Sequence, residues 1–408
     1  MKISRTAAGL LPALALFAAP GWAATSSFLT SDQTLDQILL SVDLDGDGKM
    51  NSPGETTVFF GNGNASGLVK PGNVFALSQT KNGSVVIGDG DSDTVYRLYD
   101  KDRNGDAMGE GEAQVWFSSL TNAGGYKLNT PNGIAEGPDG AVYVVEADTN
   151  GSPTGDWVYR TIDLNGDGDA NDQGEVTRWL NLKAANPTSS PFEIRFDGNT
   201  AYITDTVGAA ANVIYSARDL DNNGVVEGDE LKVFAQQGNA YDAIFDFAMD
   251  VGMGSVWTWQ WLAEGGVSSV FRFTDLDGSG VIDAANEVAE VWNTRFLDPA
   301  YTFLAGFGMD VNEKTGEIFL TSNAGADNGT WILRLLDLDG NGDFFGLGES
   351  EVVLSLSDNG AYPVRPRNVA VYSTPVDPVA PVPLPAAMPL MIAGLGALGL
   401  LRRRGRKA

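Results

Sequence analysis

One short acidic pattern occurs six times along the chain, beginning at Asp43, Asp100, Asp163, Asp219, Asp275 and Asp337. Oxygen-bearing side chains occupy positions 1, 3 and 5 of each copy, a glycine follows at position 6, and a glutamate closes the copy. Carboxylate and amide oxygens at this spacing can wrap a hard cation such as Ca²⁺, and the glycine permits the sharp turn. Six copies, spaced 56 to 63 residues apart, predict several calcium sites in a repeated architecture.

The predicted ligands are the oxygen-bearing residues of these six copies. They are Asp43, Asp45, Asp47 and Glu55; Asp100, Asp102, Asn104, Asp106 and Glu112; Asp163, Asn165, Asp167 and Glu175; Asp219, Asp221, Asn223 and Glu230; Asp275, Asp277, Ser279 and Glu287; and Asp337, Asp339, Asn341, Asp343 and Glu349. The first copy has three leading carboxylates and is expected to bind best. The fifth carries Ser279 at position 5 and is expected to bind more weakly. Acidic turns that hold no metal are the alternative.

The residues around each copy predict strands rather than helices. Alternating apolar runs precede the copies, and further apolar runs such as 56–60, 113–117 and 176–180 follow them. Each acidic loop therefore joins two strands, which excludes an EF-hand. Two more strands, exemplified by 132–137 and 141–148, precede each unit. Four antiparallel strands repeated every ~60 residues are typical of a β-propeller blade.

The two ends of this repeat predict how the ring closes. Residues 26–34 resemble 317–325, so the first blade begins at its second strand, and 365–374 resembles a lone first strand. Pairing these segments gives an all-β, six-bladed propeller over 24–374, with a DxDxDG-type calcium loop between the third and fourth strands of each blade. An open stack of hairpins is the alternative, but it would leave unpaired edges.

Composition excludes several classes of chemistry. The chain has no Cys and no His, which rules out disulfides, thiol catalysis and a Ser-His-Asp triad, and leaves oxygen-ligated metals. Outside the first 24 and last seven residues, 19 basic residues face 53 acidic ones. Nucleic acid is therefore not expected as a partner, because phosphate binding needs a basic surface. Without cations, this charge should repel itself.

Both ends of the chain predict export. Residues 1–23 have the charge, apolar core and small-residue cleavage site of a signal peptide. A Pro-rich linker, 375–385, leads to an apolar segment and basic end, 386–408, which resembles the PEP-CTERM sorting signal, with Leu384 where that signal has Glu. The resemblance implies processing by an exosortase, a transient membrane anchor in the C-terminal segment, and a location at the cell surface or outside the cell.

Two further resemblances bear on function. The acidic loops resemble those of integrin α-subunit propellers, where cations make blade hairpins rigid. The segment 131–148 resembles the blade motif of gluconolactonase-type and NHL propellers. Lactonase-type propellers hold a catalytic Ca²⁺ in the central channel, and the positions that this resemblance would bring together are Asn132, Glu193, Asp246 and Asn368. Ordinary polar residues at strand ends are the alternative.

Two smaller patterns remain. Trp257, Trp259 and Trp261 share one face of a predicted strand, either as core between blades or as a platform for sugar rings. Arg97, Arg160, Arg272 and Arg334 each stand three residues before a loop and are expected to pair with carboxylates.

These patterns predict a secreted, calcium-binding propeller, not catalytic, that binds or organises extracellular polysaccharide or surface proteins in a biofilm or floc. A calcium-dependent lactonase, esterase or phosphatase with its site in the channel is the alternative.

Overall fold

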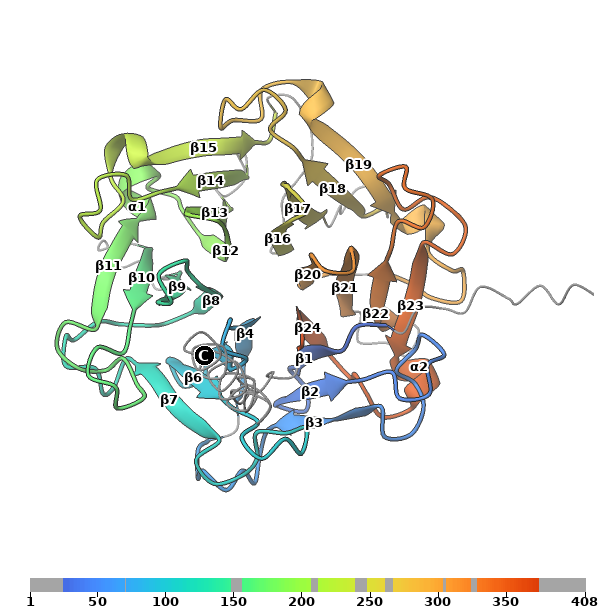
Figure 1. Cartoon of the computed structure of the whole chain (residues 1–408), viewed down its shortest axis with the longest axis horizontal. Helices are drawn as coiled ribbons and strands as arrows, with labels where there is room; N and C mark the ends of the chain where they lie inside the picture. The colour runs from blue at the N-terminus through green and yellow to red at the C-terminus, as the bar shows by residue number, and fades with distance from the viewer. Residues whose placement is uncertain are drawn as a thin grey trace, which may run out of the picture. The chain divides into compact units, whose positions relative to one another are not determined.

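Six four-stranded antiparallel sheets form a ring around a central axis (Figure 1). The computed structural model describes residues 25–69, 71–147, 156–206, 212–238, 248–260, 267–303, 306–323 and 329–373. This arrangement confirms the predicted all-β, six-bladed propeller. The predicted signal peptide, linker and sorting segment lie outside the described residues.

The blades are numbered in chain order, and their strands run from the axis outward. Blade 1 contains β24 (Pro366–Val371), β1 (Phe28–Asp32), β2 (Gln37–Ser41) and β3 (Thr56–Phe60); blade 2 contains β4 (Val74–Gln79), β5 (Val85–Asp89), β6 (Thr94–Leu98) and β7 (Ala113–Ser118); blade 3 contains β8 (Pro131–Glu136), β9 (Val142–Glu146), β10 (Trp157–Thr161) and β11 (Val176–Asn181). Blade 4 contains β12 (Pro191–Asp197), β13 (Thr200–Asp205), β14 (Val213–Ala217) and β15 (Leu231–Gln236); blade 5 contains β16 (Ala248–Gly252), β17 (Ser255–Gln260), β18 (Ser269–Phe273) and β19 (Val288–Asn293); blade 6 contains β20 (Met309–Asn312), β21 (Glu317–Asn323), β22 (Thr330–Leu335) and β23 (Ser350–Ser355).

The ring closes within blade 1. β24 from the C-terminal side pairs antiparallel with β1, with Phe28 opposite Val371 and Leu29 opposite Ala370. The predicted closing strand is therefore correct, and the open stack of hairpins is excluded. Closure removes the exposed sheet edges that an open stack would present.

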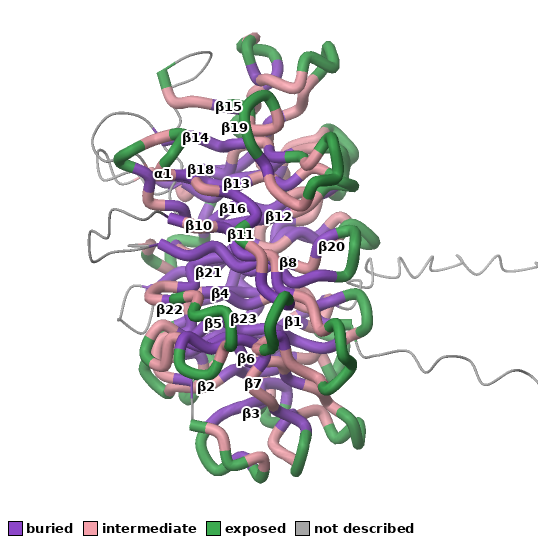
Figure 2. The backbone as a smooth tube through the Cα atoms, turned by 90° about the vertical axis from the view of Figure 1, so that its left-hand side faces the viewer, coloured by how far each residue is buried: buried purple, intermediate pink, exposed green. Residues whose placement is uncertain are grey.

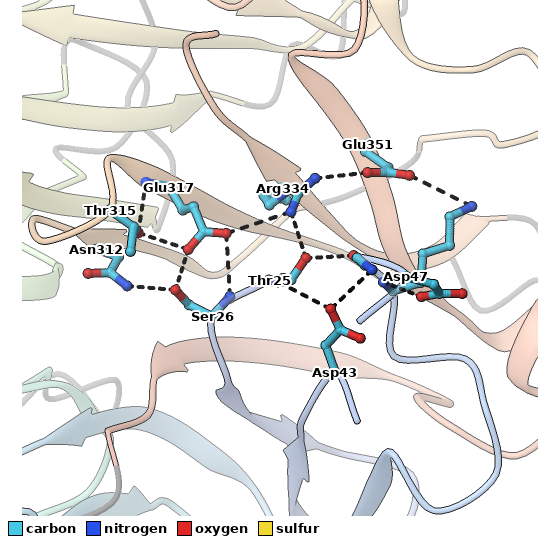
Figure 3. A network of polar contacts seen from close by, with 11 residues as sticks. Thr25, Ser26, Asp43, Asp47, Asn312, Thr315, Glu317, Arg334 and Glu351 are labelled. Carbon is cyan, nitrogen blue, oxygen red and sulfur yellow. Dashed lines mark hydrogen bonds and ion pairs between the residues drawn. The ribbon is translucent and has the colours of Figure 1, made fainter. Parts of the chain in front are cut away.

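A second set of contacts joins the start of blade 1 to blade 6 (Figure 3). Thr25 Oγ1 accepts a hydrogen bond from Arg334 Nη1 (2.6 Å) and donates one to Gly48 O (2.6 Å). Arg334 also pairs with Glu351 at 2.9 Å, and Ser26 Oγ donates to Glu317. The first acidic loop is thereby tied directly to the last blade.

The core lies between the blades, where large side chains from neighbouring sheets interlock, and Figure 2 shows buried backbone running through the middle of the ring. Trp257 and Trp259 are 3% and 0% exposed. This burial confirms the core interpretation of the tryptophan stripe for these two residues; Trp261 lies outside the described residues. Burying aromatic side chains of this size removes a large apolar area from water and contributes strongly to stability.

The described residues also form short helices outside the sheets. They are α1 (Leu182–Ala185), α2 (Leu356–Asn359), and single 3₁₀ turns at Gly228–Glu230, Ala285–Glu287 and Thr294–Phe296. In the part of the chain that the structure describes, no helix is long and apolar enough to cross a membrane. Because strands alternate in direction, the six acidic loops share one face of the ring with the turns that join each blade's first two strands.

Candidate calcium centres

Six acidic loops join the third and fourth strands of the six blades, as predicted. Loops 1 to 6 are residues 43–55, 100–112, 163–175, 219–230, 275–287 and 337–349. In every loop the position-6 glycine has a φ between +79° and +103° and donates its N–H to the position-1 aspartate. Only glycine adopts this backbone region without strain, which explains its recurrence. The glycine thereby holds the first carboxylate against the turn.

Five loops gather three carboxylates whose ligand atoms lie within 4.8 Å of one another. The groups are Asp43, Asp45 and Asp47; Asp100, Asp102 and Glu112; Asp219, Asp221 and Glu230; Asp275, Asp277 and Glu287; and Asp337, Asp339 and Glu349. Oxygens that surround Ca²⁺ at about 2.4 Å are at most ~4.8 Å apart, so these donor sets fit a calcium ion. Such groups, made only of oxygen ligands, suit a hard cation.

Loop 3 differs from the other five. Asn165 replaces the position-3 carboxylate, and its Nδ2 donates to Asp167 Oδ2 (3.1 Å) and Asp172 Oδ2 (2.6 Å). The amide thus holds two acidic side chains of the loop close together. Asp172, at position 10, was not among the predicted ligands, although it is an additional carboxylate within the loop.

Several predicted ligands accept hydrogen bonds from the backbone of the turn. Asp106 Oδ1 accepts from Met108 N (2.9 Å), and Asp343 Oδ1 accepts from Phe345 N (3.1 Å). Asn104, Asn223 and Asn341 accept from the backbone N–H two residues further on, as does Ser279 Oγ. These side chains stabilise the turn that presents the carboxylates.

The closing glutamate has a role that the sequence did not indicate. Glu55 is 2% exposed; its Oε1 accepts from Leu44 N (3.0 Å) and Asp45 N (3.3 Å), and its Oε2 accepts from Ser52 N (2.8 Å). The other five closing glutamates make corresponding contacts. The glutamate therefore fastens the two ends of the loop together from within, and in four loops it also belongs to the carboxylate group.

Each loop also wedges into the blade before it. The residue at position 8 is apolar and buried in all six loops: Met50, Ala107, Ala170, Val226, Ile282 and Phe344. Its N–H donates to a carbonyl of the outermost strand of the preceding blade, at 2.6 to 2.8 Å. Met50 makes this bond to Val353 and so connects blade 1 to blade 6. The loops are therefore built into the contacts between blades.

Local contacts shift the titration of the loop carboxylates. The backbone N–H of Ser279 lowers the pKa of Asp277, and the N–H of Leu276 lowers the pKa of Glu287. Partial burial instead raises the pKa of Asp100. A group with a lowered pKa stabilises the fold above its ordinary pKa, and that stabilisation is lost as the pH falls.

Three of the four residues predicted to converge in the channel, Asn132, Glu193 and Asn368, lie on innermost strands. Asn132 Nδ2 donates to Pro191 O (2.9 Å) and Asn368 Nδ2 to Val74 O (3.2 Å), each a contact to the next blade's innermost strand. Asp246 lies outside the described residues. The two asparagines thus join blades; the Oδ1 atom of Asn132 has no described partner.

The remaining candidate, Glu193, belongs to a buried ion network. Arg195 contacts Glu193 Oε1 through Nη1 (2.5 Å) and Asp250 Oδ1 through Nε (3.1 Å). Asp250 accepts a further bond from Val311 N (2.6 Å), and Asp310 accepts one from Val371 N (2.7 Å). The network connects the innermost strands of blades 4, 5, 6 and 1, and its members Arg195, Asp250 and Asp310 line a cavity of about 300 Å³ at the channel mouth. Glu193, one of the predicted channel residues, therefore takes part in charge pairing within the chain.

Burial dominates the electrostatics of this network. It raises the pKa of Glu193 to about 7 in spite of Arg195, and it raises the pKa of Asp310 well above the usual value, with Asp250 adding to the effect. Burial raises the pKa of Asp250 as well, so both carboxyls favour the protonated form more than a carboxyl in water does. One buried cation between these carboxyls leaves little uncompensated charge.

A second set of acids was missed altogether. The second strands of four blades end in Asp32, Asp89, Glu146 and Asp205, each buried. Their carboxylates accept backbone N–H groups from the segment that enters the innermost strand of the same blade. An acid at the same place in four repeats was the available signal, and its role is to fix chain entry.

No family model and no curated protein matches the chain. Similar solved structures include virginiamycin B lyase from Staphylococcus aureus, 16% identical over 77% of this chain and 82% of that one, with a TM-score of 0.41. Hydrazine synthase from Kuenenia stuttgartiensis is 16% identical over 80% of each chain, with a TM-score of 0.43. The calcium-binding protein regucalcin from Agrobacterium tumefaciens is 13% identical over 87% and 95%, with a TM-score of 0.42. Likeness at this level carries no argument about function.

Proposed function

We propose that this chain is an exported, calcium-stabilised binding protein that attaches to or organises extracellular polysaccharide at the cell envelope. The observation that carries the proposal is the double role of the acidic loops. They hold groups of carboxylates, and they wedge into neighbouring blades through the buried position-8 residue. A cation bound there would stiffen the contacts that hold the ring together.

The charge of the chain supports a role for calcium. The net charge is −27, and much of it lies in these loops. Cations that neutralise the loops would relieve self-repulsion in the compact state. Calcium sites that operate outside cells have dissociation constants of roughly 10⁻⁴–10⁻³ M. Export would therefore place the protein where such sites fill.

The proposed location and partners rest on the ends of the sequence. Residues 1–23 would direct export, and residues 386–408 would hold the chain in the membrane until an exosortase-type enzyme removes the segment. The partners would be polysaccharide or surface proteins rather than nucleic acid, because a strongly acidic body repels phosphate backbones.

Thermal unfolding of the mature chain with Ca²⁺ or with EGTA tests the calcium role, with Mg²⁺ as the matched ion. Calcium at about a hundredfold excess over its dissociation constant should add roughly 2.7 kcal/mol per site. Several sites should then raise the melting temperature by roughly 10 °C or more, and Mg²⁺ should do so less. Equal melting temperatures in Ca²⁺ and EGTA would refute the calcium role.

The second candidate is a calcium-dependent hydrolase acting in the channel. The observation in its favour is Glu193, a buried carboxyl whose pKa of about 7 suits a general acid or base, next to Arg195 at the channel mouth. Lactone, ester and phosphoester substrates should be assayed with the wild type and with Glu193→Gln. Turnover that Glu193→Gln removes, without loss of stability, would favour the enzyme over the binding protein.

A further inference from the structure

Three repeat-related cavities open between neighbouring blades on the face that carries the acidic loops. Each lies between the second and third strands of one blade and the acidic loop of the next. Their volumes are about 440 Å³ between blades 3 and 4, 300 Å³ between blades 4 and 5, and 490 Å³ between blades 5 and 6. The largest, called here the blade 5–6 cavity, lies within the size range of small-molecule sites.

The three cavities differ at one equivalent position on the third strand. The cavity between blades 3 and 4 has Arg160, which pairs with Asp139 at 2.7 Å. The next cavity has Ser216 there. The blade 5–6 cavity has Arg272, whose Nη1 donates to Gly342 O (2.9 Å) and which makes no ion pair with a described carboxylate. Arg272 therefore does not form the pair with a carboxylate that the sequence predicted for it.

The acids at the rim of this cavity are already engaged. Glu287 accepts hydrogen bonds from the N–H groups of Leu276, Asp283 and Ala284. Asp337 accepts from the N–H groups of Gly340 and Gly342. These two carboxylates therefore bind N–H groups of their own loops, and the guanidinium of Arg272 remains available to an incoming anion.

The rest of the lining suits a ring that has apolar faces and hydroxyl groups. Trp257 forms part of the wall, with the guanidinium of Arg272 5.8 Å from its ring centre. Met253 lines the cavity with an apolar side chain that is 43% exposed, and its φ of +53° is rare for a residue of this kind. Ser255 and Thr274 add hydroxyls, 2.7 Å apart. Backbone strain of this kind is retained where the surroundings demand it, often at binding sites.

We propose that the blade 5–6 cavity binds a sugar acid unit of an acidic polysaccharide. The carboxylate pairs with Arg272, the sugar ring lies against the exposed side chain of Met253, and the ring hydroxyls reach Ser255 and Thr274. This inference rests on the proposed function and names the class of polysaccharide that the protein binds. A guanidinium and a carboxylate form strong, directional hydrogen bonds, which would select acidic over neutral sugars.

Calorimetric titration of the calcium-loaded mature chain tests the site. The probes are a β-1,4-linked disaccharide of glucuronic acid, cellobiose as its uncharged match, and inorganic phosphate. The acidic disaccharide should bind more tightly than either of the others. Arg272→Gln should weaken that binding about tenfold or more, because a charge-assisted bond is lost. Arg160→Gln, at the equivalent position two blades earlier, should leave it unchanged.

A second variant tests the same cavity in case Arg272→Gln does not fold. Asn286 is exposed at the rim of the cavity, so Asn286→Trp should fold normally, narrow the cavity and also weaken the binding. Unchanged affinity in both variants, or equal affinity for cellobiose or phosphate, overturns the proposed site. If an acidic polymer still binds both variants as tightly as the wild type, the proposed function stands and only this site is wrong. If no polysaccharide binds the wild type, both are wrong.

Discussion

The acidic loops and the channel network are both rich in carboxylates, but they neutralise charge in different ways. In the loops, carboxylates accept backbone N–H groups and face solvent, so that a cation from outside can complete the balance. In the channel, Arg195 balances Glu193 and Asp250 from within the chain. One region should therefore respond to calcium and the other should not.

This difference has a physical origin in burial. Hydrogen bonds from the loop lower the pKa of the exposed Asp277, whereas burial raises the pKa of Glu193 and Asp310. A buried charge requires a permanent partner of opposite sign, and an exposed one does not. The loops are thus suited to reversible ion binding, and the network is suited to fixing how the innermost strands meet.

The largest effect should come from breaking the channel network. Arg195→Leu removes the buried cation and leaves Glu193 and Asp250 without their partner, which should cost about 3–5 kcal/mol of unfolding free energy. The loss, measured by urea denaturation, should be equal in Ca²⁺ and in EGTA. A loss that appears only in EGTA would show that the two regions are coupled.

The wedge of an acidic loop should come next. Phe344→Ala leaves a cavity between blades 5 and 6 and should cost about 3 kcal/mol or more. Because the loop is then no longer firmly seated, the stabilisation by Ca²⁺ should also shrink. Leu347→Ala, at a fully exposed position in the same loop, is the control and should change neither quantity. If Phe344→Ala kept the full stabilisation by Ca²⁺, ion binding would not depend on the contacts between blades.

Glu193 should make the stability of the channel network fall as the pH rises, whereas loop carboxylates with a lowered pKa lose their stabilising effect as the pH falls. Its folded-state pKa of about 7 is raised, so its contribution to stability is complete below its ordinary pKa and is lost as the pH rises through 7. Glu193→Gln should remove a decline on the order of 2 kcal/mol between about pH 5 and 8. Denaturation at several pH values in constant Ca²⁺ measures it, and an identical pH profile in the variant would contradict this assignment.

The smallest effect should distinguish one loop from another. Asp43→Ala removes one of three leading carboxylates, and Asp275→Ala removes one of two, with Ser279 at position 5 in the weaker loop. The first should cost about 1 kcal/mol more calcium-dependent stability than the second, since charge count tunes affinity. Equal losses by calorimetry would mean that ligand count does not order these sites.

The sequence predicted the repeat well because the signals for each blade lie within one short segment of the chain. Each DxDxDG pattern lies between two apolar runs, and the segment 365–374 repeats an innermost strand, so both the blades and their closure follow from spacing. The wedge was also visible, since position 8 is apolar in every acidic loop. Its role could not be recognised from the loop alone, because its partner lies on the preceding blade, at least 47 residues away in every pair.

The channel network could not be predicted in the same way. Arg195, Asp250 and Asp310 each lie two residues before the end of an innermost strand, so the repeat gives them equivalent places in three blades. Whether these side chains pair depends on the distance between neighbouring innermost strands across the channel, which no spacing in the sequence records. The amide groups of Asn132 and Asn368 made them predicted channel residues, and in the structure each donates a hydrogen bond to the next blade.

The location of calcium ions tests the central claim most directly. Crystals of the mature chain grown with Ca²⁺ should be measured at a long wavelength, where calcium scatters anomalously. Peaks should lie among the carboxylates of loops 1, 2, 4, 5 and 6, with the channel beside Glu193 and Asp250 carrying none. A single peak on the channel axis with no peak in the loops would contradict the account and favour the hydrolase.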